Sequence, residues 1–295
     1  MTALILHGGA GARRERNYEA EVAHMRQVVE AMAERLDAGD SALDVATAAV
    51  VMLEDSGLYV AGRGASPNQA GAYELDASLM DGSTRRAGSV AALQGFRNPV
   101  LAARAVMERT PHVMLAGQGA ALFAHDQGLE PIADEAAWFT GAGRGEDNHP
   151  PGALGHGTVG CCVLDGQGRL AAATSTAGVF GKMPGRVGDT PIPAAGTWAD
   201  DHAAVSCTGQ GEYFIRVAAA AQAAWRVAAG QTLAQATQAV IDQIGTLDGD
   251  GKGGDGGLIA LDAAGNIAAP FNSQGMKHAW LTPEGEIGVR VFPGT

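Results

Sequence analysis

Thr158 is the residue of this chain best placed to act as a nucleophile. It lies between two glycines, after the Gly/Pro-rich stretch 140–157 and at the start of an apolar, strand-like segment, 158–164. A hydroxyl group that opens a strand behind a removable loop suits an amidohydrolase that cleaves its own chain. Cleavage after Gly157 would give Thr158 a free α-amine with a pKa near about 7.7–8.0, which could accept the proton of its own hydroxyl.

Glycine at position 157 and three hydroxyls downstream fit the same chemistry. Gly157 leaves the peptide bond unobstructed and tolerates a strained backbone. Thr174, Ser175 and Thr176 end a second strand-like segment, and one of these hydroxyls could hydrogen-bond to the nucleophile and orient it. The alternative for the three residues is an ordinary polar strand end.

Two further groups could bind a substrate. Arg186 and Asp189 lie three residues apart between glycines, so the arginine could hold an α-carboxylate through two hydrogen bonds and the aspartate an α-ammonium group. An exposed ion pair of little energetic value is the alternative. Thr208 and Gly209 follow a strand-like segment, where a hydroxyl and a backbone N–H could stabilise an oxyanion or simply form a turn.

Two glycine-rich segments, 8–11 and 251–254, admit a different class of function, a nucleotide-binding protein or an oxidoreductase. Neither segment matches the P-loop pattern, and neither opens a helix with the dinucleotide-binding pattern. Tight turns explain both segments better.

The composition favours a globular protein of the cytoplasm. The chain has 295 residues, of which 46% are hydrophobic and 18% charged, enough for one large core. A net charge of −12 argues against nucleic acid as a partner, because phosphate binding needs a basic surface. The 3 cysteines lack metal-binding spacing and indicate reduced thiols. The first residues lack a basic signal-peptide region, and no apolar run is long enough to span a membrane.

Apolar spacing predicts strands and helices in blocks rather than in regular alternation. Strands are expected at 3–6, 73–80, 86–93, 158–164, 170–175, 203–207, 257–261 and 267–270. Helices are expected at 18–38, 42–55, 100–108, within 113–127, 212–229 and 232–244. Hairpin signals such as Asp81-Gly82 favour antiparallel sheets covered by helices.

Short blocks along nearly the whole chain resemble the plant-type L-asparaginase/isoaspartyl aminopeptidase family of N-terminal nucleophile (Ntn) hydrolases. The blocks are His7-Gly-Gly-Ala-Gly11, Glu74-Leu-Asp-Ala77, Met80-Asp-Gly82, Arg97-Asn-Pro-Val100, Gly157-Thr-Val-Gly160, Ala171-Ala-Ala-Thr-Ser-Thr176, Pro184-Gly-Arg-Val-Gly-Asp189, Ser206-Cys-Thr-Gly209 and Gly256-Gly-Leu-Ile-Ala260. They occur in the family's order, which is what carries the resemblance.

The resemblance implies an α+β fold, a four-layer αββα sandwich, with residues 1–295 as a single domain. It implies self-cleavage between Gly157 and Thr158 into an α chain, 1–157, and a β chain, 158–295, with 139–157 as a flexible linker. The active unit would be a dimer of such αβ pairs. No cofactor is implied for catalysis, but backbone carbonyls of the loop from Leu53 to Arg63 would bind a structural sodium ion.

The resemblance also implies the substrates and the roles of the site residues. L-Asparagine and β-aspartyl dipeptides would be hydrolysed through a β-aspartyl ester on Thr158. The implied catalytic residues are Thr158, Thr176, Thr208 and Gly209, and the implied substrate-binding residues are Arg186, Asp189, Gly209 and Gly211.

Two positions depart from the family's pattern. Val60 stands where the family is expected to have an asparagine, and its side chain cannot hydrogen-bond. Maturation then uses other contacts, or its rate and the substrate preference differ; an inactive homologue that only binds a ligand is the extreme alternative. Arg63 replaces an apolar residue and could reach the leaving-group side, or could be solvated.

A glycosylasparaginase is the nearest competing enzyme, because it uses the same kind of nucleophile. That family typically has Asp-Thr-Ile-Gly at the cleavage site and is secreted with disulfides. The sequence Gly157-Thr-Val-Gly160 without a signal peptide disfavours it.

Overall fold

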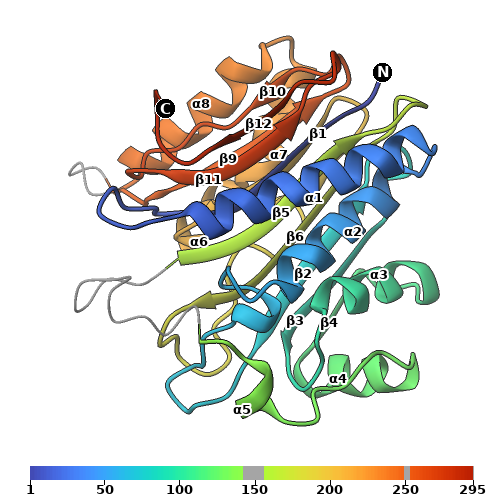
Figure 1. The fold of residues 1–295 in the computed structure, drawn as a ribbon, viewed down its shortest axis with the longest axis vertical. Helices are drawn as coiled ribbons and strands as arrows, with labels where there is room; N and C mark the ends of the chain where they lie inside the picture. Colours follow the sequence, from blue (N-terminus) through green and yellow to red (C-terminus); the bar gives the residue numbers. More distant parts are fainter. Residues whose placement is uncertain (142–155, 249–252, 295) are drawn as a thin grey trace.

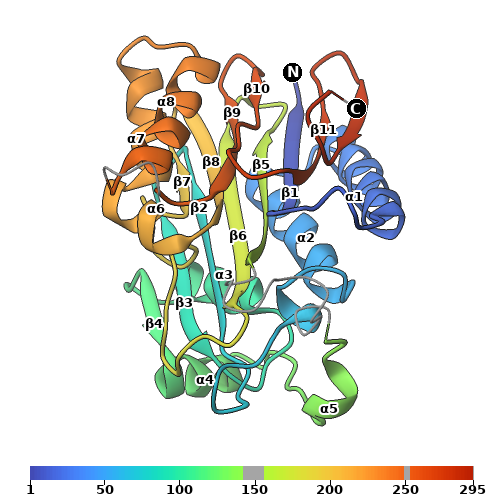
Figure 2. The same ribbon diagram turned by 90° about the vertical axis from the view of Figure 1, so that its left-hand side faces the viewer.

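Two β-sheets lie face to face between two layers of helices, as the side view in Figure 2 shows. The computed structural model describes residues 1–141, 156–248 and 253–294. Helices α1 and α2 cover one sheet, and helices α6, α7 and α8 cover the other (Figure 1, Figure 2). The four-layer αββα sandwich expected from the sequence is confirmed.

The larger sheet carries the candidate nucleophile near its centre. Its strand order is β12-β11-β1-β5-β6-β2-β3-β4, and all neighbours are antiparallel except β3 and β4. The strands are β1 (Ala3–Ala10), β2 (Leu75–Asp81), β3 (Ala87–Leu93), β4 (Met114–Ala116), β5 (His156–Leu164), β6 (Leu170–Val179), β11 (Met276–Leu281) and β12 (Ile287–Arg290). The smaller sheet has the order β10-β9-β8-β7, with β7 (Thr197–Ala199), β8 (Ala203–Gly209), β9 (Gly256–Asp262) and β10 (Ile267–Ala268).

The helices follow the predicted spacing with one interruption. They are α1 (Glu19–Asp37), α2 (Ala42–Asp55), the 3-10 turn η1 (Gly62–Gly64), α3 (Pro99–Arg109), α4 (Gly117–Asp126), α5 (Glu135–Trp138), α6 (Gly211–Val217), α7 (Ala219–Ala228) and α8 (Leu233–Thr246). The single helix predicted over 212–229 is wrong, because Ala218 adopts a left-handed conformation with φ of 49°. This bend lets Ala220 and Ala221 donate to the carbonyls of Ala195 and Ala194.

Side-chain alternation decides which residues face the space between the sheets. On β5, Val159 and Cys161 belong to the core beneath α1, α2 and α3, whereas Cys162 belongs to the core between the two sheets. On β8, Val205 packs with α7 and α8, whereas Ala204 faces the larger sheet. The even-numbered side chains of β5 and β8, including those at 158 and 208, therefore point into the space between the sheets.

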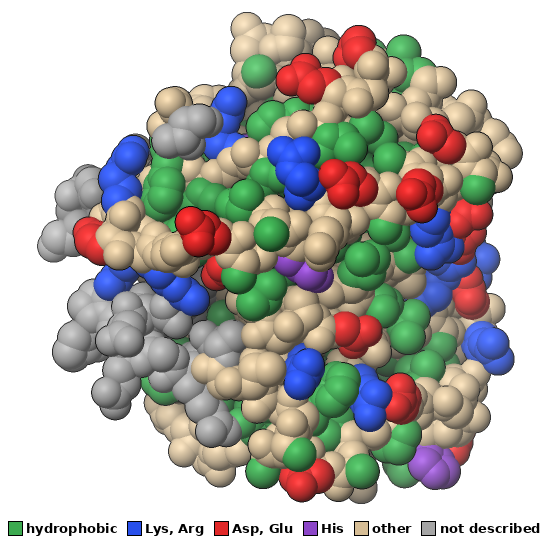
Figure 3. All heavy atoms as spheres, in the orientation of Figure 1, with side chains coloured by type: hydrophobic (Ala, Val, Ile, Leu, Met, Phe, Trp, Pro, Cys, Tyr) green, Lys and Arg blue, Asp and Glu red, His purple; other side chains and the backbone are tan. Residues whose placement is uncertain are grey.

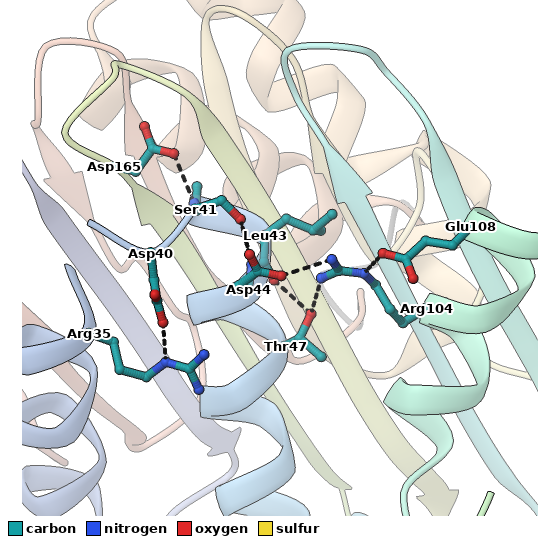
Figure 4. Close-up of polar contacts among 10 residues, drawn as sticks. Arg35, Asp40, Ser41, Leu43, Asp44, Thr47, Arg104, Glu108 and Asp165 are labelled. Atoms are coloured by element: carbon teal, nitrogen blue, oxygen red, sulfur yellow. Dashed lines mark hydrogen bonds and ion pairs between the residues drawn. The ribbon is translucent and has the colours of Figure 1, made fainter. Parts of the chain in front are cut away.

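The turn between β5 and β6 is fastened to the start of α2, as Figure 4 shows. Asp165 accepts a hydrogen bond from the Ala42 backbone N–H at 2.9 Å, and Ser41 caps the helix by accepting from the Asp44 N–H at 3.2 Å. Arg104 of α3 binds Asp44 at 2.8 Å. These contacts hold the far end of the β5–β6 pair against the outer helices.

Acidic and basic side chains are interspersed on the face shown in Figure 3. Within the described ranges, none of the helices combines the length and the apolar character needed to cross a bilayer.

Candidate active site

Thr158 and Thr176 are paired across neighbouring strands, and their hydroxyls touch. The two residues are in register between β5 and β6, and Asp76 of β2 continues the same row. Thr158 Oγ1 donates to Thr176 Oγ1 at 3.3 Å, and Thr176 Oγ1 donates to the carbonyl oxygen of Gly157 at 2.6 Å. The hydroxyl of Thr176 also accepts from the Gly178 N–H at 2.9 Å. One side chain thus contacts both the candidate nucleophile and the carbonyl that the nucleophile would attack.

Only one of the three hydroxyls at the end of β6 reaches Thr158. Thr174 lies on the same face but contacts Ser206 of β8 at 2.8 Å. Ser175 alternates to the opposite face, toward the helical layer. Of the three candidates in the sequence, Thr176 is therefore the one that the structure brings to the nucleophile.

The backbone around Gly157 is packed too closely for a side chain. A Cβ added to Gly157 would lie 2.2 Å from the Cβ of Val60, so the valine covers the residue before the cleavage point. Gly9 has φ of 101°, and a Cβ there would lie 3.4 Å from the backbone N and O of Thr158. Glycine is needed at 157 for space, whereas at 9 it is needed for backbone conformation.

Thr208 and Gly209 lie at the end of β8 that approaches this region. The Thr208 hydroxyl is buried and accepts from the Ala10 N–H at 3.2 Å, directly after Gly9 in the chain. Gly209 has φ of 149°, and an added Cβ would lie 2.5 Å from the carbonyl oxygen of Asp255. The turn at 209 therefore requires glycine, and it follows a buried hydroxyl in the space between the sheets.

Arg186 and Asp189 lie in the loop after β6 and differ in how their charges are satisfied. Arg186 donates from Nε and Nη2 to the two oxygens of Glu212, at 2.9 and 2.8 Å. Asp189 is buried, and among the described residues its Oδ2 has no hydrogen-bond partner. Burial raises the pKa of Asp189 to about 7, and the charge of Arg186 acts against this rise. A buried carboxylate that keeps one oxygen without a donor is suited to receive a cationic group.

Gly211, the first residue of α6, lies against Asp189. A Cβ added to Gly211 would lie 2.7 Å from Asp189 Oδ1. The loop after β6 and the turn after β8 therefore meet at the buried carboxylate.

His7 and Ser206 belong to a buried polar chain that the sequence did not reveal. His7 Nε2 lies 2.9 Å from Ser206 Oγ, and Thr174 connects Ser206 to Thr197, whose hydroxyl donates to it at 2.6 Å. Burial lowers the pKa of His7 to about 3, although the Thr158 carbonyl acts in the opposite direction. His7 is therefore neutral, and it is a hydrogen-bonding group rather than a charge behind the nucleophile. The signal in the sequence that could have indicated Ser206 is strand alternation, which places it on the same face of β8 as Thr208.

Arg63 binds the end of the first half of the chain. Its Nε donates to the Trp138 carbonyl at 3.1 Å, and its guanidinium lies 5.5 Å from the centre of the Trp138 ring. Phe139 stacks on Tyr73 with ring centres 3.7 Å apart. Most of the linker predicted over 139–157, residues 142–155, lies outside the described residues.

Within the described ranges, the acidic, histidine and cysteine side chains do not assemble a metal centre. In the part of the chain that the structure describes, no group of three or more His, Cys, Asp or Glu side chains could hold a metal ion. Cys161, Cys162 and Cys207 are buried free thiols.

One family model and several curated relatives match nearly the whole chain. The family model described as Asparaginase matches residues 1–289. The chain belongs to the asparaginase family. The blocks of residues quoted above, including those around Thr158 and Thr208, fall inside the matched range.

Relatives within the asparaginase family carry two kinds of name. An isoaspartyl peptidase of Salmonella typhimurium is 44% identical over 94% of this chain and 94% of its own length. The isoaspartyl peptidase of Escherichia coli is also 44% identical, over 94% of this chain and 92% of its own. A plant-type L-asparaginase of Thermococcus kodakarensis is 39% identical over 98% of this chain and 100% of its own.

Proposed function

We propose that the chain is a self-activating threonine hydrolase that cleaves the side-chain amide of L-asparagine and the isopeptide bond of β-aspartyl dipeptides. Its family and its relatives support the reaction class. The observation that carries the residue assignment is the hydrogen-bonded set of Thr158, Thr176 and the Gly157 carbonyl.

Activation begins in the uncleaved chain. Thr158 Oγ1 attacks the carbonyl carbon of Gly157, and the Thr176 hydroxyl stabilises the developing charge on the carbonyl oxygen. The hydroxyl proton passes to the departing nitrogen as the C–N bond breaks, which leaves Gly157 as an ester on Thr158. Water then hydrolyses this ester. The products are chains 1–157 and 158–295, and Thr158 now has a free α-amine.

Substrate hydrolysis uses the new amine as a base. Arg186 binds the substrate's α-carboxylate and Asp189 its α-ammonium group. The Thr158 hydroxyl then loses its proton to the amine and attacks the β-carbonyl, while Thr208 Oγ1 and the Gly209 N–H stabilise the oxyanion. The Gly209 carbonyl and Gly211 line the site.

The leaving ammonia or amine takes the proton from the α-ammonium of Thr158 and leaves a β-aspartyl ester. The α-amine then removes a proton from the attacking water, and hydrolysis releases aspartate and restores the Thr158 hydroxyl. The nucleophile, the base and the donors all come from the chain, so we propose no cofactor for the chemical steps.

We propose a structural sodium ion at the loop from Leu53 to Arg63. Several carbonyls there already accept hydrogen bonds, for example Gly57 from Thr140 and Val60 from Ala177. A carbonyl oxygen has two lone pairs, so these contacts leave room for coordination. Thermal melting in sodium chloride against tetramethylammonium chloride tests this: stabilisation by sodium alone supports the site, and equal melting temperatures count against it.

We also propose a dimer of αβ pairs acting in the cytoplasm. The buried free thiols of Cys161, Cys162 and Cys207 suit a reducing compartment. Light scattering on the cleaved protein measures the assembly directly, since one αβ pair has the mass of the chain, 29.9 kDa, and the dimer twice that mass.

The experiment that tests the function is a hydrolysis panel of β-aspartyl dipeptides, L-asparagine and a glycosylated asparagine. We expect the wild type to hydrolyse the first two classes and the Thr158→Ala variant to hydrolyse none. Activity confined to the glycosylated substrate would instead identify a glycosylasparaginase, and no activity in a cleaved, folded wild type would indicate a binding protein.

A further inference from the structure

Lys182 is a buried lysine that the proposed chemistry leaves without a role. Its side chain is 0% exposed. Its Nζ donates to the backbone carbonyl oxygen of Glu74 at 2.9 Å and lies 3.9 Å from the carboxylate oxygen Oε2 of the same residue. Burial raises the pKa of Asp76, and the positive charge of Lys182 acts against that rise. A buried ammonium group is costly unless it is paired, so two acidic side chains accompany it.

On one side, Lys182 packs against the residue that holds Thr176. A Cβ added to Gly178 would lie 3.0 Å from Lys182 Cδ and 3.4 Å from Arg186 Nη1. Gly178 has φ of 78°, and its N–H donates to the Thr176 hydroxyl. The position of Lys182 therefore bears on the orientation of the hydroxyl that contacts Thr158.

On the other side, the partner of Lys182 anchors the loop that carries Arg186. Both carboxylate oxygens of Glu74 accept from the Gly185 N–H, at 2.9 and 3.2 Å. Glu212 engages Arg186 through Nε and Nη2, while Nη1 lies toward Gly178 and Gly188. The position of Arg186 in the loop thus depends on the hydrogen bond that Gly185, the residue before Arg186 in the chain, donates to Glu74.

We propose that Lys182 and Glu74 form a positioning pair that couples Thr176 to Arg186. Lys182 supports Gly178 and so sets the self-cleavage geometry, and Glu74 holds the Gly185 N–H and so sets the grip on the substrate's carboxylate. The inference rests on the proposed function. It distinguishes this pair from a buried ion pair whose only consequence is stability.

The test replaces both members, because an apolar pair of similar volume removes the charges without leaving one of them unpaired. In the double variant Glu74→Leu with Lys182→Met, we expect self-cleavage to slow and KM for a β-aspartyl dipeptide to rise, each by about tenfold to 100-fold, since misplacement by about 1 Å has effects of that order. Wild-type self-cleavage and wild-type KM in this variant would overturn the proposal.

Two single variants keep the test decisive if the double variant does not fold. Glu74→Gln retains an acceptor for the Gly185 N–H, so its KM should stay within about threefold of the wild-type KM, which is about the scatter of such comparisons. Its KM should also stay well below that of Glu74→Leu, which has no acceptor. Lys182→Arg keeps the charge but adds bulk against Gly178, so both self-cleavage and KM should change. Wild-type constants in Lys182→Arg, or equal KM values in the two Glu74 variants, would reduce the pair to a stabilising role.

Arg169→Met is the matched control. It removes another ion pair, Arg169 Nε to Asp165 Oδ2 at 2.8 Å. This pair lies in the turn between β5 and β6, at the far end of these strands from Thr158 and Thr176. We expect a lower melting temperature with unchanged self-cleavage and KM. A wild type that matures and hydrolyses at Thr158 while the Glu74 and Lys182 variants match it overturns only the positioning pair, whereas a wild type that never cleaves overturns the proposed function itself.

Discussion

The two ends of the β5–β6 pair differ in how many hydrogen bonds the buried carboxylates near them accept. At the turn, Asp165 accepts from the N–H groups of Ala42, Gln167 and Arg169 and from the Arg169 side chain. At the other end, Asp76 and Asp189 each keep one carboxylate oxygen without a hydrogen-bond partner among the described residues. A fully satisfied acid therefore lies at one end of this strand pair, and two acids with an oxygen left unsatisfied within the described part of the chain, one on β2 and one in the loop after β6, lie near the other end.

The pKa directions follow the same division. Burial raises the pKa of Asp165, but its hydrogen bonds outweigh burial and the net shift is downward. Burial dominates at Asp189, whose pKa rises to about 7. We infer that the hydrogen bonds of Asp165 stabilise the turn, whereas the unpaired oxygen of Asp189 can accept a hydrogen bond from a cationic group of the substrate.

The largest expected effect comes from adding one methyl group at the cleavage point. Gly157→Ala places a Cβ 2.2 Å from that of Val60, so the peptide must shift and self-cleavage should slow by about 100-fold. Adding Val60→Gly removes the clash and should restore much of the rate. The time course of fragment formation on denaturing gels measures both, and a Gly157→Ala chain that matures at the wild-type rate would show that the packing at Gly157 is irrelevant to cleavage.

The next largest effect separates the two acids directly. Asp189→Asn removes the proposed partner of the substrate's ammonium group, and truncating a buried charge pair of this kind lowers kcat/KM by about 30-fold or more. The variant should still cleave its own chain. Steady-state kinetics on the matured variant checks this, and an unchanged kcat/KM would remove Asp189 from the binding site.

A smaller effect should appear in the pH dependence of product binding. Below a pKa of about 7, Asp189 becomes protonated and can no longer pair with an ammonium group. The inhibition constant of L-aspartate should therefore rise as pH falls below about 7, approaching about tenfold per pH unit. Because Glu212 also raises the pKa of Asp189, Glu212→Gln should move the midpoint to lower pH. A flat inhibition constant between about pH 5.5 and 8 would contradict the assignment.

The smallest effect on activity is expected at the turn. Asp165→Asn weakens charge-assisted hydrogen bonds and should lower the free energy of unfolding by about 1–3 kcal/mol. Asp165 has a lowered pKa, so its contribution is present above the unfolded pKa and is lost as pH falls through the folded one. Urea unfolding measures the loss, and kcat/KM should remain at the wild-type value; a kinetic defect here would erase the distinction between the two ends.

The sequence revealed the elements that repeat a clear period and missed those whose position depends on distant partners. Helix α2 was predicted with its observed bounds, Ala42–Asp55, because Ser41 provides a cap and the apolar spacing is regular. Strands β11 and β12 were not predicted, since β11 forms by pairing with β1 at the other end of the chain and β12 pairs in turn with β11. Long-range pairing leaves no local signal of that kind.

The candidate site shows the same limit. Thr158 and Thr208 could be proposed because glycines and strand ends mark them in the sequence, whereas the choice of Thr176 among three neighbouring hydroxyls came from the family resemblance. Lys182 and Glu74 could not, because their pairing joins residues more than a hundred positions apart. Glu212 was also missed, since its contact with Arg186 requires α6 to lie beside the loop after β6.

The most direct test of the account is the intact mass and N-terminal sequence of the purified chain. We predict two fragments, with the smaller beginning at Thr158 and the larger ending at Gly157, and no fragments from Thr158→Ala. A single uncut chain that hydrolyses β-aspartyl dipeptides at full rate would contradict the central claim that Thr158 must become an N-terminus to act.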